Sequence, residues 1–294
     1  MNYSNEVDVR IGTCALCGQK EARLKESHSI PKFVYQWIKE TSPTPYLRSS
    51  DNVNKREQDG PKEYLLCEKC EGNLSLMEDE FAEKAFKKIA NYRGQAPEIL
   101  VTETMRVCVL SIFWRTLLTS LSRNNNRTDE DKKVMNEFLA SAKHQINKNV
   151  ATTPIFWAPI YGDPPFYDLP PSMTYQLDRM VGAPDIRFFD DPHRYFAVFK
   201  LPFIFFFIFS EGWSDGEDDK NKFAGAVSLS DIKVIPDFLR DYIKFLNDQF
   251  EASKLDMSRY NLVKIEQEIS ESERTTGAHK SLARSQRPNK SGYA

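Results

Sequence analysis

Residues 14–31 read CALCGQKEARLKESHSIP and residues 64–71 read YLLCEKCE, so the chain contains two Cys-x-x-Cys pairs. Each pair can close a tight knuckle in which both thiolates face one ion. Two knuckles brought together make the tetrahedral four-sulfur cage that Zn²⁺ prefers, and four of the five cysteines are used in this way. The predicted ligands of a structural zinc ion are Cys14, Cys17, Cys67 and Cys70.

A disulfide framework is the competing explanation for paired cysteines. However, 5 cysteines in 294 residues are sparse for a stapled secreted domain. The first residues, MNYSNE, have neither the basic start nor the apolar stretch of a signal peptide. Reduced thiols, the missing signal and the zinc cage together predict a cytoplasmic protein.

The charges of the chain are nearly balanced, with 40 basic and 42 acidic residues and a net charge of −2. Residues 1–95 contain 15 residues of each sign. Bulk charge therefore does not indicate a protein held on nucleic acid, although a local basic groove stays open. The end of the chain is polar and locally basic, which predicts a disordered tail over residues 270–294. A weak contact of this tail with nucleic acid or a partner is the minor alternative.

The most apolar stretch, Tyr195–Phe209, reads YFAVFKLPFIFFFIF. It is shorter than the ~20 residues that a membrane-spanning helix needs, and it contains Lys200 and Pro202. Its aromatic and β-branched residues instead predict one or two buried strands, with a break at Pro202. We therefore expect a core sheet here and no contact with a membrane.

Hydrophobic periodicity, punctuated by Pro and Gly, predicts an α+β protein. Residues 1–95 are expected to form a zinc-bound module in which strands and helices alternate around the knuckles. Its expected elements are a strand over Ala22–Ile30, a helix over Lys32–Glu40, a long mobile loop over Thr41–Pro61, a strand over Glu63–Leu66 and a helix over Glu71–Tyr92.

A helical segment is expected over residues 96–150 and a mixed strand and helix region over residues 151–269. The segment 152–235 is expected to hold short β-type runs, including SMTYQLDRMVG. The expected helices cover Pro97–Arg123, the stretch from the cap Thr128 to about Lys148, and the stretch from Pro236 to about Ser253, with a further short element over Leu262–Ile269.

The order of these features resembles the zinc-stapled branch of the His-Asn-His (HNH, ββα-metal) endonucleases. That order is a knuckle, a strand ending in ESHSIP, a loop, a strand, and YLLCEKCE opening a helix. The resemblance covers residues 11–92, and its most specific parts are the cysteine spacing and His-x-Ile-Pro. It implies a metal-dependent enzyme that hydrolyses the phosphodiester bonds of DNA, or of RNA, and for bacterial proteins a role in defence against phage.

The resemblance also assigns roles to residues. His28 stands where the family has its general base, and Glu71 stands where the family has a metal-binding His. Asn73 and Glu78 are nearby candidates, and Glu78 shares the helical face of Glu71. A base that deprotonates water and a divalent ion that neutralises phosphate charge are what this hydrolysis needs. A carboxylate at position 71 suits Mg²⁺ or Mn²⁺, while the structural zinc takes no part in the chemistry.

Two positions depart from the family pattern. Ser27 stands where the family has a metal-binding Asp or His, and the central Asn falls near Lys62. Asn52, Asn54 or Gln58 can replace that Asn only if the loop folds back. These departures keep a second interpretation open, in which the chain is a non-catalytic zinc-ribbon module that binds nucleic acid or protein. A third is an effector that cuts only with a partner. The C-terminal region would supply recognition, regulation or a protein-partner surface.

Overall fold

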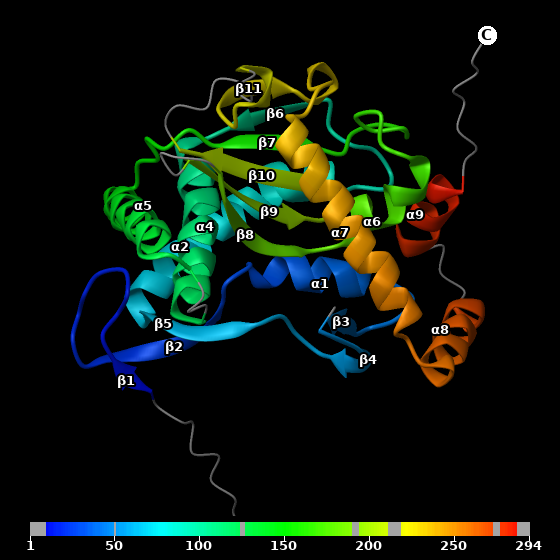
Figure 1. Ribbon diagram of the computed structural model, residues 1–294, viewed down its shortest axis with the longest axis horizontal. Helices are drawn as coiled ribbons and strands as arrows, with labels where there is room; N and C mark the ends of the chain where they lie inside the picture. Colours follow the sequence, from blue (N-terminus) through cyan, green and yellow to red (C-terminus); the bar gives the residue numbers. More distant parts are fainter. Residues whose placement is uncertain are drawn as a thin grey trace, which may run out of the picture.

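The computed structural model of the protein describes residues 10–49, 51–123, 127–189, 194–210, 219–272 and 277–286. Helices and strands alternate along this part of the chain (Figure 1), which confirms the predicted α+β class. The N-terminal region carries a three-stranded antiparallel sheet in the order β1-β2-β5, followed by a long helix. Its elements are β1 (Ile11–Gly12), β2 (Ala22–His28), β5 (Lys62–Cys67) and α2 (Glu68–Phe81), and α2 continues through the π-helical turn η1 (Ala82–Phe86) into α3 (Lys87–Ile89).

The strands and helices predicted for this region are confirmed, and α1 spans Lys32–Glu40 as expected, with Pro31 at its N-cap. The pairing of β2 with β5 shifts register between Lys25 and Ser27. A bulge of this kind changes the direction of the side chains beside it. The end of β2, which carries His28, therefore departs from the simple alternation of a regular strand.

A hairpin interrupts the stretch Thr41–Pro61, where β3 (Leu47–Ser49) pairs with β4 (Asn52–Glu57). The prediction of a long mobile loop is therefore wrong here. Polar residues without a local partner are typical of a loop. Here the polar side chains pair with residues far along the chain, on helix α8 (Arg259–Glu271), which local sequence does not reveal.

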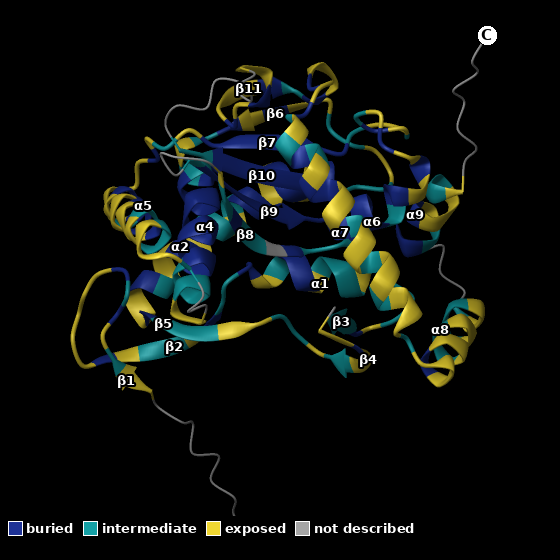
Figure 2. Ribbon diagram, viewed as in Figure 1, coloured by how far each residue is buried: buried dark blue, intermediate teal, exposed yellow. Residues whose placement is uncertain are grey.

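Four antiparallel strands in the order β7-β10-β9-β8 form the central sheet. The stretch Tyr195–Phe209 supplies two of them, joined at Pro202 and Phe203, as predicted. Figure 2 shows that β9 and β10 are buried along most of their length. The strands are β7 (Phe156–Pro159), β8 (Gly182–Phe189), β9 (Arg194–Leu201) and β10 (Ile204–Phe209).

Helices cover both faces of this sheet. Residues an odd number apart on a strand point to opposite faces, so Phe199 and Phe196 of β9 contact different helices. Phe199 packs edge-on against Phe113 of α4 (Glu103–Arg123), with ring centroids 4.6 Å apart. Phe196 contacts Phe238 of α7 (Asp237–Leu255) with ring centroids 4.5 Å apart. Figure 1 shows α7 crossing the sheet on one side.

Helix α4 lies at the centre of the core, and its residues from Val107 to Leu117 are all buried. Among the helices that the structure describes, it alone is long and apolar enough to cross a membrane. However, 67% of its most apolar stretch is buried inside the protein, as expected for a core helix. The cytoplasmic location stays a prediction.

Two stretches adopt a different structure from the one predicted. Residues 97–101 were expected to be helical, but β6 (Glu98–Val101) pairs with β11 (Gly225–Ser228) before α4 begins. Ile99 and Val101 are buried alternately, which is the period of a strand. The run SMTYQLDRMVG was expected to be β-type, but most of it lies in η2 (Pro171–Met173) and α6 (Thr174–Arg179), and Gly182 at its end begins β8. Five of the six residues of α6 are buried, so the burial pattern shows neither a helical nor a strand period.

The C-terminal helices agree with the prediction except at the end. Helix α5 (Asp129–Lys148) begins after Thr128, whose hydroxyl accepts the backbone N–H of Asp131 at 3.1 Å. The expectation of a disordered tail is wrong for α9 (Gly277–Ser285), because Ser281 on this helix is fully buried against α6. The remaining short turns are η3 (Asp219–Asn221) and η4 (Leu229–Asp231).

Buried residues of the N-terminal region and of the central sheet form one continuous core. Trp37 of α1 packs edge-on against Phe203 with ring centroids 6.1 Å apart, and Phe81 of α2 packs against Phe206 at 5.8 Å. Residues from three of the expected parts, 1–95, 96–150 and 151–269, therefore share one core, which fixes the cysteine-containing region to the sheet.

Candidate metal and catalytic site

The four predicted zinc ligands come together in the structure. One ligand atom from each of Cys14, Cys17, Cys67 and Cys70 lies within 4.8 Å of all the others. In a tetrahedral cage with Zn–S bonds of about 2.3 Å, neighbouring sulfurs are about 3.8 Å apart. The Sγ atoms of Cys17 and Cys67 are 3.8 Å apart, so this donor set fits a zinc ion.

The local backbone explains how each knuckle closes. Gly18 adopts a φ of 77°, a left-handed conformation that glycine tolerates, and its N–H donates to the carbonyl of Cys14 at 2.9 Å. The N–H of Cys67 donates to Cys14 Sγ at 3.3 Å. Burial raises the pKa of the Cys14 thiol, but hydrogen bonds from the backbone of Cys17 and Cys67 outweigh it and lower the pKa to about 7. Burial and the neighbouring thiols raise the pKa of Cys70, so the four thiols differ in how readily they ionise.

The cysteine cluster joins the turn between β1 and β2 to the start of α2. Cys67 ends β5 and caps α2, while Cys70 lies in the first helical turn. A metal ion held by all four sulfurs would therefore fix β2 and β5 against the N-terminus of α2. Residues at the end of β2 and in the first turns of α2 are positioned by this arrangement.

His28 is the last residue of β2 and is largely buried, with its side chain 10% exposed. Its ring lies 5.7 Å from the ring of Tyr35 on α1. Its Nε2 lies 2.9 Å from Oδ1 of Asp59, although this carboxylate is not in line with the ring N–H. The sequence-predicted base therefore has a carboxylate as its neighbour.

Asp59 follows β4 and is a site residue that the sequence analysis missed. Its Oδ1 accepts the N–H of Gly60 at 3.0 Å, and Lys62 Nζ lies 3.3 Å from its Oδ2. Burial raises the pKa of Asp59, but the contacts with His28, Gly60 and Lys62 outweigh it and hold the pKa below its ordinary value. Asp59 is therefore ionised beside the imidazole.

Glu71 lies in the first turn of α2, and its Oε2 is buried without a hydrogen-bond partner among the described residues. Burial raises the pKa of this carboxyl above its ordinary value. The charges of Arg115 and His28 and the Ser27 hydroxyl act in the opposite direction, and Glu78 adds to the increase. Glu71 and His28 thus lie within electrostatic reach of each other.

Arg115 of α4 connects the parts of this cluster and is the second residue that the sequence analysis missed. Its Nη2 donates to Glu78 Oε1 at 2.6 Å, and its Nη1 donates to the backbone carbonyl of His28 at 3.0 Å. Arg115 is buried, and Glu78 is largely so. The predicted shared face of Glu71 and Glu78 is therefore turned toward the protein interior.

The other candidate residues lie elsewhere. Asn73 is exposed on α2 and is not brought to the cluster. Asn54 accepts the backbone N–H of Ser258 at 2.8 Å, so it faces the C-terminal helix α8. Asp59 therefore takes the place beside His28 that an Asn was expected to fill.

Neither a scan against protein-family models nor comparisons with curated proteins and with solved structures found a match. The chain's own geometry must therefore carry any functional conclusion. That geometry consists of a four-cysteine cluster fit for a metal ion and, at the adjoining strand and helix, a partly buried group of one imidazole, three carboxylates and one guanidinium.

Proposed function

We propose that the protein is a metal-dependent endonuclease of the HNH type that hydrolyses DNA. One observation carries the proposal: the His28 imidazole lies 2.9 Å from the Asp59 carboxylate, and the partly buried Glu71 carboxylate lies in the first turn of the adjoining helix α2. A base, a group that orients it and a ligand for a divalent ion are the parts that phosphodiester hydrolysis needs.

His28 is the general base in this proposal. In this role the imidazole accepts a proton from water and becomes positively charged. The Asp59 carboxylate then stabilises the imidazolium that forms. Asp59 thus supports the base through its charge, at the place where the family pattern has an Asn.

Glu71 is the residue that would hold a divalent ion. Its buried Oε2 has no partner among the described residues, and carboxylate oxygen is a ligand that Mg²⁺ and Mn²⁺ prefer. Such an ion, when bound, neutralises charge on the phosphate and on the leaving oxygen. Arg115 holds Glu78 and the end of β2 in place through its two hydrogen bonds.

The test is nicking of supercoiled plasmid DNA in Mg²⁺ or Mn²⁺ by four variants. We expect His28→Ala and Glu71→Gln each to lose activity by about 10²- to 10⁴-fold, the usual contribution of a general base or a comparable group. His144→Ala and Asn73→Ala are matched controls, because both residues are exposed and outside the cluster. Zinc content and thermal unfolding identify variants that fail to fold. Equal cleavage by the wild type and by His28→Ala would contradict the proposal.

Two departures from the family pattern, Ser27 and the missing central Asn, favour a second candidate, a zinc module that binds nucleic acid or protein without cutting. The balanced charge of residues 1–95 favours protein over nucleic acid as the partner of such a module. It requires that no cleavage occurs with any divalent ion on DNA or RNA while binding persists. A binding measurement beside the nicking assay separates the two candidates. The predicted cytoplasmic location depends on sequence composition alone. The predicted role in phage defence depends on the family resemblance alone.

A further inference from the structure

Helix α8 contacts the β3–β4 hairpin through a partly buried network of hydrogen bonds and ion pairs. The carboxylate of Glu268 accepts a hydrogen bond from the Tyr46 hydroxyl and pairs with Arg56 Nη2 at 2.9 Å. The Arg56 guanidinium also lies over the Tyr46 ring, 4.1 Å from its centroid. Tyr46 directly precedes β3 and Arg56 lies near the end of β4, so one carboxylate contacts the hairpin close to both of its ends.

The N-terminus of α8 contacts both strands of the same hairpin, at Arg48 of β3 and at Asn54 of β4. Asn261 donates to Asn54 Oδ1 at 3.0 Å and accepts from Arg48 Nη2 at 3.0 Å. The side chain of Asn54 donates in turn to the carbonyl of Asp256 at 3.0 Å. Asn261 is buried, which makes these bonds stronger than the same contacts in water.

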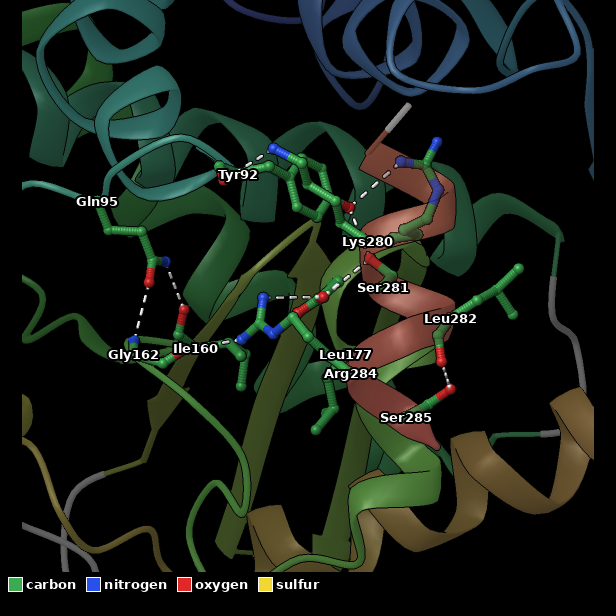
Figure 3. Close-up of polar contacts among 12 residues, drawn as sticks. Tyr92, Gln95, Ile160, Gly162, Leu177, Lys280, Ser281, Leu282, Arg284 and Ser285 are labelled. Carbon is green, nitrogen blue, oxygen red and sulfur yellow. Dashed lines mark hydrogen bonds and ion pairs between the residues drawn. The ribbon is translucent and has the colours of Figure 1, made fainter. Parts of the chain in front are cut away.

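Helix α9 holds the start of the segment that carries the hairpin. The N–H of Ala278 donates to the carbonyl of Thr41, the C-cap of α1, at 3.1 Å. Figure 3 shows Ser281 beside Tyr92, where the two hydroxyls are 2.8 Å apart, and Arg284 reaching the carbonyl of Gly162. Ser281 and Arg284 also contact the buried carboxylate of Asp178 at 2.8 and 3.1 Å.

The segment held by these two helices ends at the candidate active site. Arg56 is three positions before Asp59, and the backbone between them is fixed by Lys39 Nζ, which donates to the carbonyl of Gln58 at 2.8 Å. Gly60 passes so close to the Tyr35 ring that a Cβ there would lie 2.1 Å from it. The backbone around Asp59 is therefore held between helix α1 on one side and the end of the hairpin, three residues away, on the other.

We propose that α8 and α9 form a C-terminal clamp that completes the active site, with Glu268 as a positioning residue that acts through the β3–β4 hairpin on Asp59. The inference rests on the proposed nuclease function. A catalytic group displaced by about 1 Å can cost 10²-fold in rate, so a remote clamp of this kind has a measurable effect. The C-terminal helices thus belong to the catalytic unit.

The test compares Glu268→Ala with Glu266→Ala in the full chain. Both variants remove one carboxylate from the same helix, but Glu266 is exposed. We expect Glu268→Ala to lower kcat by about 10- to 100-fold with little change in KM, and Glu266→Ala to leave both unchanged. An unchanged kcat in Glu268→Ala would overturn the proposal.

The same substitution in an Asp59→Asn background separates an effect of Glu268 on the position of Asp59 from a general loss of stability. In Asp59→Asn, we expect the further change Glu268→Ala to have no additional effect on kcat, because the carboxylate through which the clamp acts is gone. Multiplicative losses in the double variant would overturn the positioning role.

A readout that needs no activity keeps this inference distinct from the proposed function. The Gly60 N–H is bonded to Asp59 Oδ1, so its hydrogen exchange reports on the position of that carboxylate. We expect faster exchange at Gly60 in Glu268→Ala and not in Glu266→Ala. Should the wild type cut no substrate, the proposed function fails, while unchanged exchange at Gly60 would overturn the clamp itself.

Discussion

Arg115 on α4 donates to the Glu78 carboxylate on α2 at 2.6 Å, and the two side chains are only 3% and 16% exposed. This pair joins the helix that follows the cysteine cluster to the helix at the centre of the core. The second arm of the same guanidinium holds the carbonyl of His28 at 3.0 Å. The candidate active site is therefore anchored in the core of the protein.

We expect Arg115→Met to destabilise the protein by about 3–5 kcal/mol, because it leaves the largely buried Glu78 carboxylate without its partner. Arg106→Met is the matched control on the same helix. Arg106 pairs with the more exposed Glu103, so its loss should cost about 1 kcal/mol or less. Urea unfolding measures both values, and equal costs for the two variants would contradict the anchoring role of Arg115.

The cysteine cluster should hold about one zinc ion per chain, because structural sites of this type close with four ligands. We expect Cys70→Ser to lose the metal and to lower the unfolding temperature, as a strong chelator should do in the wild type. Cys108→Ala is the control, since Cys108 is a buried thiol on α4 outside the cluster. Metal analysis checks both variants. A metal-free protein that unfolds like the wild type would refute the structural role.

Lys200 gives the stability of the protein a specific pH dependence. Its fully buried ammonium donates to the carbonyls of Leu177 and Met180 at 2.9 and 2.6 Å. Burial lowers its pKa from 10.5 to about 7, although the charge of Asp178 acts in the opposite direction. Between these two values the unfolded chain keeps a proton that the folded protein has released. The free energy of unfolding should therefore rise with pH from about pH 7, by at most about 1.4 kcal/mol per unit.

Lys200→Met removes the titrating amine. Comparison with the wild type therefore isolates the pH-dependent contribution of Lys200 to the free energy of unfolding. We expect the wild type to gain stability relative to Lys200→Met as the pH increases from about 7 to about 9, as measured by urea unfolding at each pH. The carbonyls left without a donor in the variant add a cost that does not vary with pH. A stability difference that stays constant over this range would show that Lys200 is charged in the folded protein.

The packing of α9 can be tested at Gly277, where an added Cβ would lie 2.1 Å from the ring of Tyr92. We expect Gly277→Ala to displace α9 and to increase hydrogen exchange at Ser281 and its neighbours. Gly72→Ala is the control: a Cβ at Gly72 in α2 meets nothing within 4 Å, so this change should stabilise the protein by about 0.5–1 kcal/mol. Unchanged exchange in Gly277→Ala would contradict close docking of α9.

The sequence is sufficient to predict features that depend on local spacing. The two Cys-x-x-Cys pairs identify the metal cluster because each knuckle is a local structure. The break at Pro202 likewise identifies two strands. Helix α1 was predicted with its correct ends because Pro31 marks its start and its apolar residues keep helical period.

The remaining features depend on contacts between distant segments, which no local pattern encodes. The polar residues around Asp59 predict a loop, and only the approach of Asp59 to His28 in the folded protein identifies it as a site residue. Arg115 lies in an apolar helix and meets Glu78 only after folding. The β3–β4 hairpin and α9 were missed because their polar side chains find partners far along the chain.

The most direct measurement is the anomalous scattering of manganese in crystals of the protein soaked in Mn²⁺. The account predicts a peak at coordination distance, about 2–2.5 Å, from the Glu71 carboxylate, on the side that faces His28. Crystals of Glu71→Gln should lose that peak and keep the zinc signal at the four cysteines. A well-ordered wild-type site without manganese at Glu71, in a protein that still cleaves DNA, would contradict the central claim.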